Sequence, residues 1–222
     1  MNEPDVMVYL MTGFLDSGKS QFLKFTLTQD YFQIDGTTLL ILCEEGEEEF
    51  DPLEMAKHGV KIIKIEEQEE LTEAFLNELH EKYSPERVVI EYNGMWKVSD
   101  FEALNLPEGW EIEQKLTTVD ASTFQMYLNN LKPLFVEMVR GAELVLFNRC
   151  TDIEPLAGYR RSVKVVSPQA EVIFEDENGE IENIFGDDVP YDLNAPVIEI
   201  PREDYGSGMW MLWKIRTDTR EK

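Results

Sequence analysis

Hydrophobic residues along the chain fall into short runs, separated by polar segments and by segments with helical spacing of apolar residues. Short apolar runs with many β-branched members are typical of strands that are buried on both faces of a parallel sheet. We predict such strands at residues 6–11, 39–42, 60–65, 88–90, 116–119, 144–147, 163–166 and 171–174.

The segments between these runs carry helical signals. Leu71, Phe75 and Leu79 recur every four residues with acidic residues between them, which predicts an amphipathic surface helix over 71–83. Further helices are predicted after the first strand and over 122–140. Strands that alternate with helices form right-handed βαβ units, so we predict an α/β fold with a mostly parallel sheet flanked by helices.

The end of the chain differs from the rest. Asn178-Gly179 is a strong signal for a hairpin turn. We therefore predict one α/β domain over residues 1–175, followed over 176–222 by a β-hairpin and a short extension. The Met/Trp-rich stretch 209–213 is either a strand over the core or an apolar patch for a partner, which includes a second copy in a homodimer.

Charge narrows the range of partners. Twenty Lys and Arg residues against 45 Asp and Glu residues give a net charge of −25, which repels nucleic acid and anionic membranes and favours cations or basic partners. No apolar run reaches the ~18 residues of a membrane span, and the first residues lack the basic start of a signal peptide. The two cysteines cannot form a disulfide framework. We expect a cytoplasmic protein without nucleic-acid binding or membrane insertion.

Residues 13–20 read GFLDSGKS, which fits the pattern G-x-x-x-x-G-K-[ST] of a phosphate-binding P-loop. The segment lies between a predicted strand and a predicted helix, where backbone N–H groups and the helix N-terminus would face phosphates. Lys19 would reach the β- and γ-phosphates, and the Ser20 hydroxyl would bind Mg²⁺. We predict a P-loop NTPase domain with nucleotide contacts from Gly13, Asp16, Ser17, Gly18, Lys19, Ser20 and Gln21.

Asp16 is an unusual residue for such a loop. A carboxylate a few ångströms from a triphosphate costs about 1–3 kcal/mol at an effective dielectric constant near 20. Nucleotide binding would then be roughly ten- to a hundredfold weaker. Alternatively, the side chain points outward to solvent and costs little.

Several motifs in order resemble those of the CobW-like GTPases, which include metallochaperones related to the nickel-insertion GTPases of urease and hydrogenase. GFLDSGKS resembles the family's GFLGSGKT. The other matches are CEEGE at 43–47 with Asp51 for N-E-x-G-E…D, EYNG at 91–94 for E-x-x-G, VDA at 119–121 with Phe124 for VDA…F, and SPQA at 167–170 for N-P-x-A. The resemblance runs from about residue 5 to 174.

The resemblance implies roles for particular residues. It makes Lys19, Glu47 and Glu91 the expected catalytic residues, since Lys19 stabilises transition-state charge and the carboxylates position water or Mg²⁺. Gly94 would let its loop approach the γ-phosphate. The candidate Mg²⁺ ligands are Ser20, Glu44, Glu47, Asp51 and Glu91. Ser167, in the last motif, is expected to contact the nucleotide.

The base-reading motif N-K-x-D is altered in this chain. Asn148 and Arg149 fit its first two places, but Thr151 stands where the guanine-selecting Asp belongs, and Asp152 comes one residue late. A bulged loop would restore the contact to guanine; otherwise Asp152 is the N-cap of a helix that begins at 153 or 154. GTP and GDP are therefore the expected nucleotides, with ATP as the alternative.

The family's metal-binding motif is missing. The C-x-C-C cluster is replaced by an acidic stretch at 65–70 without cysteine, which is a solvated surface or helix start, or alternatively a carboxylate metal site. With only two histidines in the chain, we do not expect an imidazole cage. The stretch after the hairpin is also too short for the family's complete C-terminal domain.

Two functions follow from these patterns. The first is a slow Mg²⁺-dependent GTPase whose nucleotide state controls docking onto a client protein, with metal homeostasis as one setting. The second is a nucleotide-binding regulatory module with little or no hydrolysis.

Overall fold

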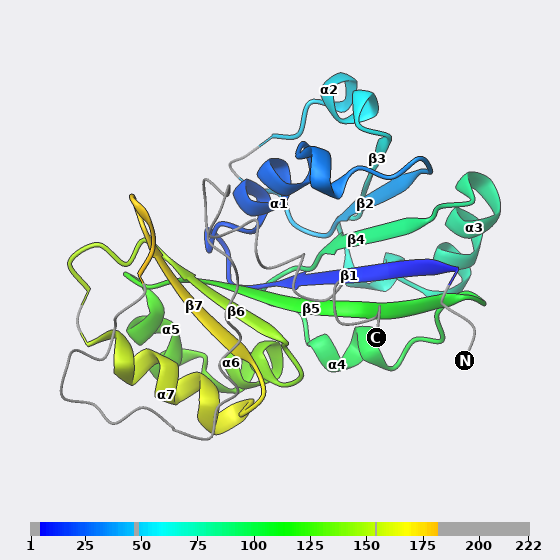
Figure 1. Ribbon diagram of the computed structural model, residues 1–222. Coiled ribbons are helices and arrows are strands. Elements are labelled where there is room, and N and C mark those ends of the chain that lie inside the picture. Colours follow the sequence, from blue (N-terminus) through cyan, green and yellow to red (C-terminus); the bar gives the residue numbers. More distant parts are fainter. Residues whose placement is uncertain (1–4, 47–48, 154, 182–222) are drawn as a thin grey trace, which may run out of the picture.

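The computed structural model describes residues 5–46, 49–153 and 155–181. Its centre is an eight-stranded sheet of order β3-β2-β4-β1-β5-β6-β7-β8 (Figure 1). Strands β1 to β7 are parallel, and β8 pairs antiparallel with β7. The strands are β1 Val6–Thr12, β2 Thr38–Leu42, β3 Val60–Lys64, β4 Arg87–Glu91, β5 Trp110–Asp120, β6 Leu144–Asn148, β7 Glu171–Asp176 and β8 Gly179–Glu180. The predicted α/β fold with a mostly parallel sheet is confirmed.

Helices cover both faces of this sheet. They are α1 Lys19–Leu27, α2 Pro52–Lys57, α3 Glu73–Tyr83, α4 Val98–Glu102, α5 Phe124–Asn130, α6 Lys132–Val139 and α7 Leu156–Val166, with short 3₁₀ turns at Asp30–Phe32 and Gln68–Glu70. Helices α1 and α2 lie on one side of the sheet, and α4 to α7 lie on the other (Figure 1). Side chains of α1 and α2 pack into one apolar core, and those of α3 to α7 pack into the opposite core. Within the described ranges, no helix is long and apolar enough to cross a membrane.

Two predicted elements differ from the structure. The strand predicted at 163–166 is wrong, because these residues form the last turn of α7. Leu156, Tyr159 and Val163 are buried at helical spacing, whereas Val165 is 78% exposed. The short valine-rich run therefore has the composition of a strand, although its burial pattern is that of a helix. The helix predicted over 122–140 is two helices that meet at Leu131, close to a proline at the start of α6.

A hairpin follows β7, but its turn lies one residue earlier than the predicted Asn178-Gly179, because Gly179 is already the first residue of β8. Asp176 pairs with Gly179 and Glu175 pairs with Glu180, so the two residues between them make the turn. The division of the chain at residue 175 stays a prediction, because residues 182–222, including the Met/Trp stretch, lie outside the described residues.

The sheet has a topological switch point at β1. The chain leaves β1 for β2 on one side, and it later passes from β4 to β5 on the other side. In open parallel sheets, ligands bind beyond the carboxyl ends of the strands at such a point. The glycine-rich loop after β1 lies there.

Candidate functional site

The glycine-rich loop, residues 13–18, joins β1 to α1 in a conformation that needs glycine. Gly13 has φ +145° and Gly18 has φ +89°. A Cβ at Gly13 would overlap the Thr118 carbonyl oxygen, and a Cβ at Gly18 would overlap the Asn148 amide. The glycines thus allow the loop to pass against β5 and β6 without steric conflict.

Lys19, the first residue of α1, is buried with its charge compensated. Its Nζ donates to the carbonyl oxygens of Gly13 (2.8 Å) and Phe14 (2.9 Å). It also forms an ion pair with Glu44 Oε2 at 2.6 Å, in which both side chains are largely shielded from solvent. Because Glu44 follows β2, the pair ties the loop after β2 to the P-loop. A triphosphate that approaches Nζ would compete with this carboxylate.

Ser20 lies one residue further and faces the end of β4. Its hydroxyl donates to Glu91 Oε1 at 2.6 Å. Burial raises the pKa of Glu91, and the nearby Glu44 carboxylate raises it further, while the Ser20 hydrogen bond and Lys19 partly offset this rise. Glu91 is therefore a buried carboxyl group that is held beside a hydroxyl and an ammonium group.

These oxygen donors fit Mg²⁺. The cation is usually held by one or two carboxylates together with substrate phosphates and water, rather than by a complete protein cage. Ser20 and Glu91 would supply the protein ligands, and Glu44 lines the same cavity. Among the described residues, no group of three or more His, Cys, Asp or Glu side chains is arranged to hold a metal ion. The site therefore fits a phosphate-bound Mg²⁺ better than an independent metal centre.

Asp51 is the other predicted Mg²⁺ ligand that the structure describes, and it has a different role. Glu47 lies outside the described residues. Asp51 is exposed at the start of α2, where its Oδ1 accepts from the Leu53 N–H at 2.8 Å as the helix N-cap. The structure therefore gives Asp51 a capping role in this conformation.

Asn148, the last residue of β6, holds the P-loop from the side. Its Nδ2 donates to the Ser17 carbonyl oxygen at 2.8 Å. Its Oδ1 is buried without a hydrogen-bond partner. A buried acceptor of this kind is costly unless another molecule satisfies it.

Arg149 makes a second link to the P-loop. Its Nη1 donates to the Asp16 carbonyl oxygen at 2.8 Å and pairs with Asp120 Oδ2 at 2.7 Å. Burial works to raise the pKa of Asp120, but hydrogen bonds from Ser122 and Arg149 outweigh it and hold that pKa below its ordinary value. The first two residues of the altered base-reading motif thus both contact the P-loop backbone.

Asp16 occupies a left-handed position, with φ +60°. Asp tolerates this region better than most residues, although glycine adopts it more readily. The side chain is exposed, yet Asp16 lines the small cavity at Lys19 and Ser20. Asp16 therefore lies at the exposed rim of the cavity.

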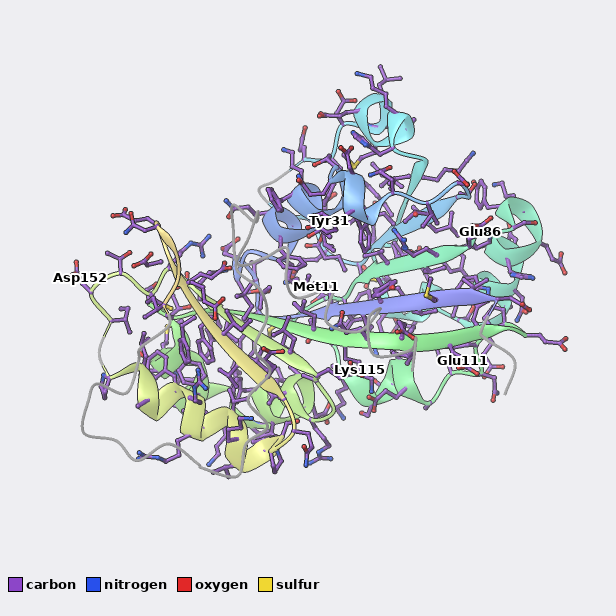
Figure 2. All side chains as sticks on the ribbon, viewed as in Figure 1. Met11, Tyr31, Glu86, Glu111, Lys115 and Asp152 are labelled. Carbon is purple, nitrogen blue, oxygen red and sulfur yellow. The ribbon has the colours of Figure 1, made fainter. Side chains whose placement is uncertain are left out.

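Asp152 and Ser167 lie apart from the P-loop. Asp152 is exposed with φ +59°, on the outer loop after β6 (Figure 2). The expectation that it caps a helix is wrong, because α7 begins at Leu156 with Pro155 as its N-cap. Ser167 precedes β7, and its hydroxyl donates to the carbonyl oxygen of Ala142 before β6 (3.3 Å). Ser167 therefore lies at the opposite end of the strands from the P-loop.

Gly94 packs against the P-loop itself. A Cβ there would overlap the Gly13 carbonyl oxygen and come within 2.8 Å of Phe14 Cα. The preceding residue, Asn93, donates from Nδ2 to the Cys43 carbonyl oxygen at 3.1 Å. The loop after β4 thus touches both the P-loop and the end of β2, whereas the sequence suggested an approach to the γ-phosphate.

Three adjoining cavities lie around the P-loop and the start of α1. The phosphate-side cavity is lined by P-loop residues with Lys19, Ser20, Glu44 and Glu91, and it shares the last three with an acidic hollow beside β3. On the other side lies a base-side cavity of about 470 Å³, within the usual size of ligand pockets. Its lining residues are Gly18, Gln21, Phe22, Phe25, Leu146, Asn148, Arg149, Thr151, Glu175, Asp176 and Glu177.

The three carboxylates of the base-side cavity were not predicted. Glu175, Asp176 and Glu177 come directly after the predicted strand 171–174, so a sequence signal existed. Residues that follow a parallel strand lie at the ligand-binding edge of the sheet. What the sequence lacked was the identity of the neighbouring strand, which the structure shows to be β6.

Comparison with known proteins assigns the domain. The family model for the nucleotide-binding domain of CobW/HypB/UreG proteins matches residues 7–174. Among solved structures, the Zn(II)-bound YjiA GTPase from E. coli is similar at 21% identity and TM-score 0.59, over 82% of this chain and 60% of that one. The hydrogenase maturation factor HypB from Archaeoglobus fulgidus is similar at 16% identity and TM-score 0.52, over 78% and 82%.

HypB from Helicobacter pylori in complex with nickel also has this fold, at 12% identity and TM-score 0.51, over 78% of this chain and 80% of that one. This chain spans three fifths of the length of the YjiA protein. The comparison with curated protein sequences gives no match. Because the family model covers most of the chain and the fold agrees, the protein belongs to the CobW/HypB/UreG family of nucleotide-binding proteins.

Proposed function

We propose that this protein binds Mg²⁺-GTP at the P-loop and hydrolyses it slowly, with its nucleotide state controlling a client protein. One observation carries the proposal: the buried Lys19 ammonium group lies beside the Ser20–Glu91 hydrogen bond at the mouth of a glycine-rich loop. This combination supplies a phosphate-binding amine and oxygen ligands for Mg²⁺ within one cavity.

The residues present divide the chemistry among them. Lys19 would neutralise charge on the β- and γ-phosphates, and the P-loop N–H groups would fix their positions. Mg²⁺, held by Ser20 and Glu91, would neutralise the charge that develops on the transferred phosphoryl group. For Lys19 to reach a γ-phosphate, the Glu44 carboxylate must leave its place 2.6 Å from Nζ. Triphosphate binding and a shift of the loop after β2 are therefore linked.

A route from this site to the protein surface supports control of a client. The loop after β4 contacts the P-loop at Gly94 and the end of β2 through Asn93. The next residue, Met95, is 56% exposed, and Leu15 in the P-loop is 45% exposed. A partner that covers these apolar side chains would contact the P-loop and the loop after β4, and both of these adjoin the loop after β2 that must shift when the triphosphate binds.

Two observations favour the alternative, a regulatory module with little hydrolysis. The Glu44 carboxylate forms an ion pair with the Lys19 ammonium group, and the Asp16 carboxylate adds negative charge at the same cavity. Both would weaken triphosphate binding more than diphosphate binding. Tight binding of GDP without measurable phosphate release would therefore support this alternative.

The metal-homeostasis setting rests on the family and on relatives described with Zn(II) or nickel. The chain's own cysteines are unsuited to thiolate ligation in this conformation. Burial raises the pKa of both Cys43 and Cys150 to about 12, so both remain protonated near neutral pH. We therefore propose that these two thiols are not metal ligands in this conformation.

Calorimetric titration of GTP, GDP and ATP with Mg²⁺, followed by phosphate release, tests the proposal. Lys19→Ala should abolish saturable binding. Lys57→Ala, an exposed lysine in α2, is the charge-matched control and should bind normally. Absence of nucleotide binding by the unmodified protein would overturn the proposal, and binding without turnover would favour the regulatory alternative.

A further inference from the structure

The base-side cavity lacks the carboxylate that the family's base-reading motif would supply. Thr151 occupies the place of the usual Asp and lines the cavity, whereas Asp152 is exposed and does not. A carboxylate reaches the cavity instead from β7, through Glu175. Glu175 is therefore the candidate carboxylate for hydrogen bonds with the edge of a purine.

Strand register places Glu175 beside Asn148. Leu146 pairs with Ile173 and Phe147 pairs with Phe174 in the parallel ladder of β6 and β7, so the next positions are Asn148 and Glu175. The backbone N–H of Cys150 donates to the Glu175 carbonyl oxygen at 3.0 Å, which keeps the two strand ends together. Neighbouring side chains in such a ladder lie on the same face of the sheet.

That face is the one that holds the cavity. Leu146 and Ile173 belong to the apolar core on the α1 side, whereas Phe147 and Phe174 belong to the opposite core. Alternation along the strands therefore directs Asn148 and Glu175 toward α1. Phe22 and Phe25 of α1 form the opposite, apolar wall.

The other two carboxylates of the cavity are less suited to bind a base. Asp176 Oδ1 accepts from the Asn178 N–H at 2.7 Å and so stabilises the hairpin turn. Glu177 is exposed in that turn. Glu175 is partly buried, and its cross-strand partner is Glu180, a second carboxylate. Like charges placed directly opposite destabilise a sheet, so the pairing of Glu175 with Glu180 does not itself account for a carboxylate at this position.

Guanine matches this lining better than adenine. Its N1–H and N2–H₂ groups are adjacent donors, and the two oxygens of one carboxylate can accept a hydrogen bond from each of them. Adenine presents the N1 lone pair beside N6–H₂, so a carboxylate there would face an acceptor. Asn148 lies next to Glu175 and retains one N–H of its amide for a purine nitrogen, since the other is bonded to Ser17.

We propose that Glu175 is the specificity-determining residue of this protein, accepting hydrogen bonds from N1–H and N2–H₂ of guanine in place of the missing motif aspartate. The inference rests on the proposed nucleotide-binding function and adds the base that is selected. Asn148, Glu175 and the aromatic residues of α1 together form the base site.

Binding constants for GDP, ADP and xanthosine diphosphate (XDP), measured with Mg²⁺ by calorimetry, test the assignment. The unmodified protein should prefer GDP over ADP by a large factor, because ADP leaves the carboxylate unpaired. Glu175→Gln should weaken GDP binding by roughly 10- to 100-fold and strengthen XDP binding, since an amide can donate to the carbonyl at position 2 of xanthine. Glu180→Gln is the matched control and should preserve the preference of the unmodified protein.

The possible failures are distinct. If the unmodified protein binds GDP and Glu175→Gln leaves the ratio of GDP to ADP affinity unchanged, the assignment of Glu175 is overturned while nucleotide binding stands. A preference for ADP in the unmodified protein would also overturn the assignment of Glu175 while nucleotide binding stands. If none of the diphosphates binds, the proposed function itself is overturned, and this inference with it. Thermal unfolding of each variant verifies that the fold is intact.

Discussion

The phosphate side and the base side of the site keep the family pattern to different degrees. On the phosphate side, Gly13, Gly18, Lys19 and Ser20 all lie where the P-loop pattern predicts. On the base side, only the first two residues of the motif contact the P-loop, and the acidic groups of the cavity come from β7 and the following turn.

This difference has a physical origin. Phosphates are bound by backbone N–H groups at close range, so the loop's path is restricted by positive φ values and by contacts that exclude a Cβ. The edge of a base is bound by side chains, and a carboxylate can reach the same edge from more than one strand end. The phosphate side therefore tolerates fewer changes than the base side.

Gly94→Ala should have the largest effect on stability and nucleotide binding, because the added methyl group would meet backbone atoms of the P-loop, which cannot move aside as a flexible side chain can. The added methyl group would overlap the Gly13 carbonyl oxygen and Phe14 Cα. We expect a loss of about 2–4 kcal/mol in the free energy of unfolding and loss of GTP binding, measured by urea unfolding and calorimetry.

Gly158→Ala is the matched control for this substitution. Gly158 lies inside α7, and an added Cβ meets no atom within 4 Å. Because alanine is a better helix former, this variant should gain up to about 1 kcal/mol and bind GTP normally. Normal GTP binding by Gly94→Ala would show that the P-loop does not depend on the loop after β4.

Glu44→Gln should have the next largest effect, in the opposite direction. Removal of the carboxylate charge from Lys19 leaves the amine available to the triphosphate, so GTP should bind roughly 10- to 100-fold more tightly. Glu45→Gln, an exposed neighbour, is the control. Weaker Mg²⁺-dependent binding by Glu44→Gln would instead make Glu44 a Mg²⁺ ligand.

The same contrast explains how much of the site could be predicted from the sequence. Lys19 and Ser20 were predicted because the P-loop is continuous in sequence, and both lie at the cavity. Glu175 was not predicted, because its role depends on the register of β7 with β6, which is set by tertiary packing. Ser167 matched a short motif, yet it lies at the far end of the strands, because a match of a few residues does not show which end of a strand it occupies.

The fold was more predictable than the site. Buried parallel strands appear in the sequence as continuous apolar runs, and seven of the eight runs are strands in the structure. The exception, at 163–166, is a short valine-rich run in which helix and strand cannot be distinguished without the buried residues one turn earlier.

Asp16→Gly should tighten GTP binding roughly tenfold if the carboxylate lies near the phosphates. The exposure of the side chain keeps the expected effect at the lower end of an unscreened estimate. Asp16→Asn is the informative control, because Asn also tolerates φ +60° but carries no charge. An unchanged affinity in both variants would show that the carboxylate points to solvent.

The smallest expected effect concerns the base side and its dependence on pH. Burial raises the pKa of Glu175, and the facing carboxylate of Glu180 raises it further. Because the folded pKa lies above the ordinary value, the stabilisation from this group is complete at low pH and is lost as pH rises through the raised pKa. Glu175→Gln should therefore increase the free energy of unfolding at pH 7 by about 0.2–1 kcal/mol.

This gain should disappear below the ordinary glutamate pKa, where Glu175 is protonated in both the folded and the unfolded chain. Urea unfolding of both proteins at pH 4 and pH 7 measures the difference. A loss of stability at pH 7 would mean that the Glu175 carboxylate makes a bond the fold needs. A gain in the free energy of unfolding at pH 7 would instead show that the Glu175 carboxylate lowers stability when no nucleotide is bound. This result is expected for a carboxylate whose hydrogen-bond donors come from the bound base.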